Sequence, residues 1–255
     1  MSDPRIQRFA KLLTNYCVKV KPGEQVLLQG SLTATSLVRE TYRQVLHAGG
    51  HPRVFWQDEA LREIYLREGN EDQLSHVFDA RHQIFETIDC LINIRGAENT
   101  RSLSAVPLEK QRLAQAASAK IMQTYMKRAA EGKLRWVSTL FPTAAHAQEA
   151  DMSLSDYEDF VFGACFVDQE DPVAEWQKLS AMQQTLVDWL NGKKSVRVEG
   201  PNAELTLDIS NRIFINSDGQ RNMPSGEIFT GPVEESVNGC VRFTNTAIYQ
   251  VREHA

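Results

Sequence analysis

The sequence lacks the features that mark membrane, secreted and nucleic-acid-binding proteins. No stretch reaches the roughly 18 consecutive apolar residues that a membrane-spanning helix needs. The N-terminal Met1-Ser2-Asp3-Pro4 leads directly into an amphipathic pattern, without the apolar core of a signal peptide. The 255 residues include 28 Lys and Arg against 33 Asp and Glu, and the basic residues form no cluster, so no nucleic-acid partner is expected. We therefore expect a cytoplasmic protein without a membrane partner.

Paired cysteines and nucleotide-binding motifs are also absent. Cys17, Cys90, Cys165 and Cys240 stand far apart and include no C-x-x-C pair, which is typical of reduced core residues. A glycine follows the first predicted strand in Gln29-Gly30-Ser31, but the chain contains neither G-x-G-x-x-G nor G-x-x-x-x-G-K-[ST]. A nucleotide cofactor is therefore not expected.

The histidines form no recognisable metal motif. Two of them are four residues apart, but a glycine pair interrupts the helix that would place both on one face. His146 lies near Glu149 and Asp151, a group that could bind a cation or could equally form a charged loop between helices. We leave these residues out of the candidate site.

Short apolar strands alternate with amphipathic helices over the first 190 or so residues. Parallel strands cannot be joined by a tight turn, so this alternation predicts an α/β domain over residues 1–191, with a mainly parallel sheet flanked by helices. Asp3 and Pro4 have the residue types that cap and begin a helix, and so do Asp171 and Pro172. The predicted strands are 25–29, 53–56, 88–94 and 134–140.

The pattern changes after Asn191-Gly192, where helical spacing gives way to alternation. Strands are predicted at 195–199, 204–208 and 212–216, and Asn238-Gly239 predicts a tight hairpin between 233–237 and 240–244. Residues 192–255 are therefore expected to be the β-rich beginning of a second domain, with sheet edges that lack a covering partner.

One carboxylate, Glu227, is enclosed between two Pro/Gly turns in the stretch 222–232. Pro224 restricts its own backbone and that of Met223, and Gly226 permits angles closed to other residues. The backbone that leads to Glu227 would thus have restricted angles, and Glu227 would lie at the edge of a short strand. This is a common place for a ligand-binding or catalytic acid. The alternative is a surface turn in which Glu227 is only solvated.

The stretch 222–232, together with Asn238-Gly239 and 246–249 after it, resembles the thermophilic-type metallo-aminopeptidases, the aminopeptidase T and aminopeptidase S group. The resemblance covers essentially the whole chain. It is supported upstream by Asp3-Pro4-Arg5, Val20-Lys21-Pro22-Gly23-Glu24, Pro142-Thr143 with Ala147-Gln148 and Met152-Ser153, and Asp171-Pro172 with Trp176.

The resemblance implies a hydrolase that removes N-terminal residues from peptides with water activated by two divalent metal ions, Zn, Co or Mn. It implies that Glu227, in the P-x-G-E motif, is one metal ligand, and that the protein is a homodimer. It also implies that the remaining ligands, a second Glu, two His and an Asp, lie beyond the matched part of the family. No catalytic residue is assigned.

Residues after Glu227 offer only Glu234, Glu235, Glu253 and His254, none in the context of those ligands. We therefore expect a chain truncated relative to the family, with loose metal binding and no turnover by itself, because catalytic metal sites usually need three protein ligands. The alternative is a non-catalytic binding or assembly module that retains the aminopeptidase N-terminal fold.

Overall fold

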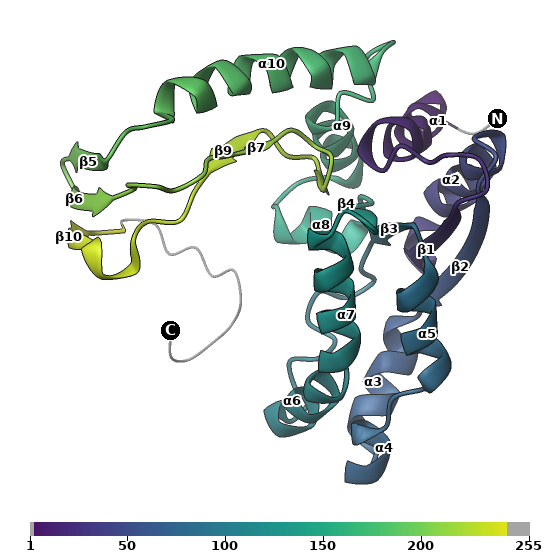
Figure 1. Ribbon diagram of the computed structural model, residues 1–255. Coiled ribbons are helices and arrows are strands. Elements are labelled where there is room, and N and C mark those ends of the chain that lie inside the picture. The colour runs from purple at the N-terminus through teal and green to yellow at the C-terminus, as the bar shows by residue number, and fades with distance from the viewer. Residues whose placement is uncertain (1–2, 244–255) are drawn as a thin grey trace. The chain divides into compact units, whose positions relative to one another are not determined.

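The computed structural model describes residues 3–243, which divide between two compact units. The first unit comprises the chain up to Leu179 together with Ser217–Gly226, and the second comprises Ser180–Asn216 and the chain from Glu227. Figure 1 shows the elements of both units. The domain boundary predicted between residues 191 and 192 stays a prediction.

A five-stranded sheet forms the centre of the first unit. Its strands lie in the order β2-β1-β3-β4-β8, and all four pairings are parallel. This arrangement confirms the predicted α/β fold with a mainly parallel sheet. The strands are β1 (Gln25–Ser31), β2 (His51–Gln57), β3 (Cys90–Arg95), β4 (Arg135–Leu140) and β8 (Asn222–Met223).

Helices precede, connect and follow these strands, as the alternating pattern predicts. A π-helix at Leu12–Cys17 continues the first helix, and a 3₁₀ turn at Leu32–Ala34 precedes the second. The α-helices are α1 (Pro4–Lys11), α2 (Thr35–His47), α3 (Glu59–Glu68), α4 (Glu71–Ser75), α5 (Asp79–Thr87), α6 (Leu108–Ala117), α7 (Ala119–Ala130), α8 (Ala144–Glu149), α9 (Leu154–Ala164) and α10 (Pro172–Leu190), of which α10 runs from the first unit into the second.

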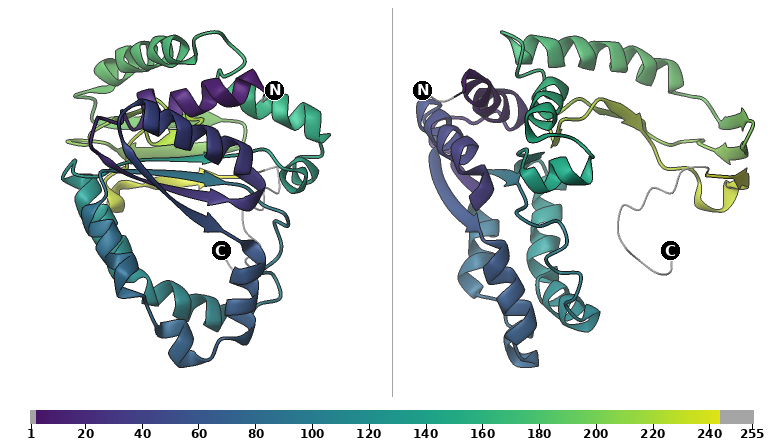
Figure 2. Two further views of the ribbon diagram at one scale, coloured as in Figure 1. Left: turned by 90° about the vertical axis from the view of Figure 1, so that its right-hand side faces the viewer. Right: turned by 180° about the vertical axis from the view of Figure 1, so that it is seen from behind.

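Both faces of the parallel sheet are covered. Side chains of α1, α2 and α9 pack with Val26 and Leu28 of β1 on one face, and those of α5 and α7 pack with Leu27 and Leu91 on the other. In Figure 2, left, the purple helices α1 and α2 lie on the opposite side of the strands from the blue and teal helices α5 and α7. Burial from both sides explains the unbroken apolar run in β1.

Local sequence determines where two of the helices begin. Asp3 accepts a hydrogen bond from the backbone N–H of Arg5 at 2.8 Å, with Pro4 at the first helical position, as predicted. At α9, Ser153 accepts from the backbone N–H of Asp156 at 3.1 Å. These bonds satisfy N–H groups that have no partner within the helix.

A polar clamp joins the amino ends of the strands. Arg135 forms an ion pair with Glu24 at 2.5 Å, and its Nε donates to the carbonyl oxygen of Val18 at 2.6 Å. The thiol of Cys90 lies beside it, 3.1 Å from Nη2 of Arg135. Burial of that thiol raises the pKa of Cys90 to about 12.

Two small sheets make up most of the second unit. The first is antiparallel, with strands in the order β10-β6-β5, and the second pairs β7 with β9. This confirms the predicted antiparallel strands after the α/β region, although the strand expected at 212–216 is confined to β7. The bounds are β5 (Ser195–Gly200), β6 (Ala203–Asp208), β7 (Ile215–Ser217), β9 (Glu227–Phe229) and β10 (Asn238–Val241).

The hairpin predicted around Asn238-Gly239 is wrong. Both residues lie within β10 and pair with β6, and the preceding segment contains a 3₁₀ turn at Glu234–Ser236 instead of a strand. Gly239 has φ +131°, and a Cβ there would collide with the carbonyl oxygen of Glu204. Glycine is thus needed for close approach of two backbones, not for a turn.

Three of the four cysteines are buried and unpaired, as predicted, but Cys240 in β10 is exposed. The prediction of a core position is therefore wrong for Cys240, because β10 is exposed along its whole length. Within residues 3–243, no helix is long and apolar enough to cross a membrane.

Candidate functional site

The segment that leads to Glu227 is anchored by the sheet of the first unit. β8 adds to the edge of β4, where the hydroxyl of Thr139 donates to the carbonyl oxygen of Met223 at 2.6 Å and the N–H of Ser138 donates to that of Arg221 at 2.8 Å. The side chain of Met223 is buried, and the peptide bond to Pro224 is cis. The residues before the Pro-Ser-Gly-Glu sequence are therefore held by both hydrogen bonds and packing.

A tight turn at Gly219 packs against the start of α10. Gly219 has φ +89°, and a Cβ there would lie 2.8 Å from the side chain of Met223 and 3.0 Å from the ring of Trp176. The hydroxyl of Tyr16 donates to the carbonyl oxygen of Asp218 at 2.9 Å. Glycine is required here because the positive φ and the close packing both exclude a side chain.

Gly226 then sets the backbone direction immediately before the carboxylate. Its φ is +113°, its N–H donates to the carbonyl oxygen of Ser217 at 3.0 Å, and the hydroxyls of Ser217 and Ser225 are 2.7 Å apart. A non-glycine residue rarely adopts such a φ. The sequence-based expectation that Gly226 places the next residue through special backbone angles is therefore met.

Glu227 is the first residue of β9, and its side chain is exposed. Its carbonyl oxygen accepts a hydrogen bond from Nε2 of Gln183 at 2.7 Å, and the same amide donates to Asn216 at 3.1 Å. Among residues 3–243, no hydrogen bond or ion pair involves the carboxylate of Glu227. Its backbone is thus fixed while both carboxylate oxygens are accessible to a ligand.

Gln183 is a neighbour of the candidate ligand Glu227 that sequence reasoning missed. It is buried on α10, one turn from Leu179 and one turn from Val187. An amide in an apolar helical stripe is a usable signal, because buried polar side chains are normally hydrogen-bonded. Here the bond supports the backbone of Glu227.

The described residues do not make a metal site by themselves. Within residues 3–243, no group of three His, Cys, Asp or Glu side chains is placed to hold a metal ion. Catalytic metal sites usually have three protein ligands and an open position. Glu227 is therefore one candidate ligand, and a complete catalytic metal site would need further ligands from outside residues 3–243.

The group around His146 has structural partners instead. Nδ1 of His146 is 2.9 Å from the hydroxyl of Thr143, and its ring stacks on Tyr157. Burial lowers the pKa of His146. Glu149 pairs with Arg101 at 3.1 Å, and that hydrogen bond lowers the pKa of Glu149. The expected charged loop between helices is wrong for His146 and Glu149, because both lie in helix α8, and only Asp151 lies in the turn that follows it.

One protein family matches nearly the whole chain. The family model for thermophilic metalloprotease (M29) matches residues 2–253. Aminopeptidase 2 of Geobacillus stearothermophilus is 26% identical over 97% of this chain and 65% of its own length. Aminopeptidase T of Thermus thermophilus is 22% identical over 93% of this chain and 63% of its own length.

A solved structure resembles the fold over a similar extent. Wild-type AmpT from Thermus thermophilus superposes with a TM-score of 0.77 at 19% identity, covering 92% of this chain and 63% of that one. The chain thus spans less than two thirds of the length of the relatives it matches.

Proposed function

The chain belongs to the thermophilic metalloprotease (M29) family. We therefore propose that it functions as a metal-dependent aminopeptidase, an enzyme that hydrolyses N-terminal residues from peptides. Relatives whose names give aminopeptidase activity support this reaction class. The resemblance further supports two metal ions, Zn, Co or Mn, and a cytoplasmic homodimer with peptides as substrates.

Glu227 is the residue proposed to contribute to the metal site. The observation that carries this proposal is that the backbone of Glu227 is held by a hydrogen bond while its exposed carboxylate has no hydrogen bond or ion pair within residues 3–243. A carboxylate held in this way can bind a divalent cation without first breaking an ion pair. The other ligands would have to come from outside the described residues, and the catalytic step would depend on them.

A second candidate is a binding or assembly module without catalytic activity. It shares with the first candidate the α/β fold and the lack of a three-ligand group within residues 3–243, and differs in having no catalytic partner residues elsewhere. In this case the chain would keep the α/β fold and the Pro-Ser-Gly-Glu turn, while hydrolysis would not occur.

Metal titration of the full 255-residue chain tests the role of Glu227. The protein is dialysed free of metal and titrated with Co²⁺ or Mn²⁺, and Glu227→Gln is compared with Glu235→Gln. Glu235 is the matched control, because it is an exposed carboxylate in the 3₁₀ turn and pairs with no cation among residues 3–243. We expect Glu227→Gln to weaken metal binding by roughly tenfold or more, with Glu235→Gln unchanged.

Hydrolysis of a leucine chromogenic amide tests whether this chain has aminopeptidase activity. Cleavage that requires metal and is lost in Glu227→Gln but not in Glu235→Gln supports the aminopeptidase. Metal binding at Glu227 without cleavage fits both the module and an aminopeptidase whose other ligands lie outside this chain. The gene sequence beyond codon 255 then separates the two, because further His and Asp ligands encoded downstream favour the aminopeptidase and their absence favours the module. Equal metal binding by the unaltered chain and Glu227→Gln would exclude Glu227 as a ligand.

A further inference from the structure

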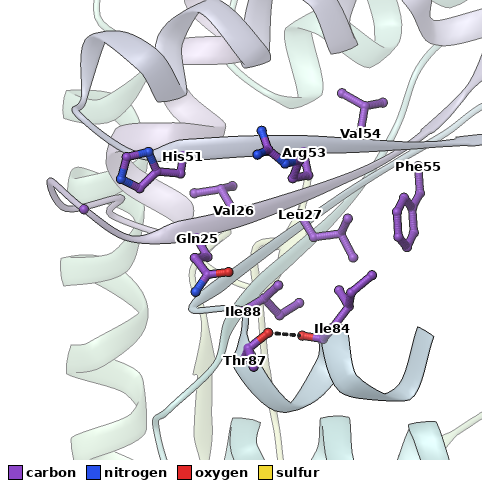
Figure 3. Close-up of a pocket in the computed structure, with 11 residues that line it drawn as sticks. Gln25, Val26, Leu27, His51, Arg53, Val54, Phe55, Ile84, Thr87 and Ile88 are labelled. Carbon is purple, nitrogen blue, oxygen red and sulfur yellow. Dashed lines mark hydrogen bonds between the residues drawn. The ribbon is translucent and has the colours of Figure 1, made fainter. Parts of the chain in front are cut away.

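A cavity of about 570 Å³ opens in the first unit, beside the amino ends of β1 and β2 (Figure 3). It lies on the face of the sheet that α5 covers, far along the chain from Glu227. Its apolar lining includes Leu27, Phe55, Ile84 and Ile88. Its polar lining comprises Gln25, His51, Arg53 and Thr87.

The strand register explains why this cavity exists. Gln25 pairs with His51 and Leu27 with Arg53 in the parallel ladder, so these side chains share one face of the sheet. On that face Phe85 of α5 and the following Ile88 pack with Leu27, while the edge strand β2 is less covered and Phe55 is only partly buried. The cavity is therefore lined partly by the apolar residues named above and partly by the polar ones, and several of these residues belong to β2 (Figure 3).

The charge of the lining is of one sign. Arg53 is the one permanently charged residue among those that line the cavity, and none of them is Asp or Glu. Arg53 is exposed, its Nη1 donates to the neighbouring carbonyl oxygen of Pro52 at 3.3 Å, and no carboxylate within residues 3–243 pairs with it. A guanidinium has five N–H donors, so most of its hydrogen-bonding capacity is available to a ligand.

We propose that this cavity binds a small amphipathic carboxylate, with its apolar body on Leu27, Phe55 and Ile84 and its carboxylate on Arg53. The cavity volume falls within the roughly 300–1,000 Å³ of small-molecule sites. The planar fork of an arginine matches the two oxygens of a carboxylate. The lining offers no acid to pair with an ammonium group, so a simple alkyl carboxylate fits better than a free amino acid.

Calorimetric titration of the unaltered chain with three octyl compounds tests this chemistry. Octanoate carries both the apolar body and the charge, octanamide keeps the body without the charge, and the α-amino derivative of octanoate adds an ammonium group. We expect octanoate to bind and the other two to bind roughly tenfold more weakly, a difference of about 1.4 kcal/mol. Octanamide binding as tightly as octanoate, or no octanoate binding at millimolar concentration, would overturn the proposal.

Variants then locate the site. Arg53→Gln should weaken octanoate binding by roughly tenfold and leave octanamide binding unchanged. Arg39→Gln is the matched control, because Arg39 is an exposed arginine of α2, the helix that packs on the other face of the sheet. Octanoate binding that is equal in Arg53→Gln and the unaltered chain, or weakened equally by both substitutions, would place the carboxylate elsewhere and refute the assignment. The comparison of octanoate with octanamide needs no variant, so it stands even if Arg53→Gln folds poorly.

Discussion

Replacement of Trp176 by Phe should destabilise the first unit more than any exposed tryptophan replacement. Trp176 is fully buried, its ring lies 5.3 Å from that of Phe166, and its Nε1 donates to the carbonyl oxygen of Cys165 at 3.0 Å. It also forms the surface against which the turn at Gly219 closes. Phenylalanine keeps one aromatic ring but removes the donor and part of the buried volume.

The magnitude follows from these two losses. Leaving the buried carbonyl of Cys165 without its donor costs about 1–3 kcal/mol. Losing about 40 Å² of buried apolar surface at about 25 cal/mol per Å² costs about 1 kcal/mol more. We therefore expect Trp176→Phe to lower the free energy of unfolding by about 2–4 kcal/mol.

Urea unfolding followed by far-ultraviolet circular dichroism measures this change. Trp56→Phe is the control, because Trp56 is 45% exposed in the edge strand β2 and should change stability by no more than about 0.5 kcal/mol. The reasoning is refuted if Trp176→Phe unfolds at the same urea concentration as the control. That result would mean that the packing of α10 on the Gly219 turn contributes little.

Three further predictions concern the same unit and its boundary. Arg135→Met should lower the free energy of unfolding by about 1–2 kcal/mol, because it breaks the partly exposed ion pair with Glu24 and leaves the carbonyl of Val18 without a donor; an unchanged urea midpoint would contradict this. Burial raises the pKa of Cys90 to about 12 from a usual 9.0, so the unfolded chain loses this proton at lower pH than the folded chain. The free energy of unfolding should therefore fall as pH rises above about 9, and Cys90→Ala should reduce this pH dependence in base titrations. Limited proteolysis should cut first within residues 190–202, and first cuts within 24–140 would argue against the predicted domain boundary.

The sequence predicts the first unit well where local patterns decide the structure. The four long strands and the Asp3 cap follow from periodicity and residue type, because each is determined within a few neighbouring residues. β8 could not be predicted, because it has two residues and depends on pairing with β4, where Thr139 precedes Met223 by 84 positions in the sequence. The hairpin at Asn238-Gly239 failed for the same reason, since long-range pairing with β6 overrides a local turn preference.

Prediction of the candidate site was partial. Glycine and proline indicated a preset backbone at Glu227, and the positive φ of Gly226 agrees with that expectation. The place of Gln183 in an apolar helical stripe indicates a buried hydrogen bond, but its partner, the carbonyl oxygen of Glu227, could not be predicted because it depends on how α10 meets β9 in space. The role of Glu227 as a metal ligand stays a prediction.

The placement of Ser217–Gly226 in the first unit has a consequence for protein synthesis. A ribosome completes residues up to Leu179 well before it makes β8, because all of Ser180–Asn216 must be made in between. At roughly 5–20 residues per second, that interval lasts a few seconds. During it the edge of β4 and one side of Trp176 lack their final neighbours, so the nascent chain offers an open strand edge to chaperones or to other nascent chains.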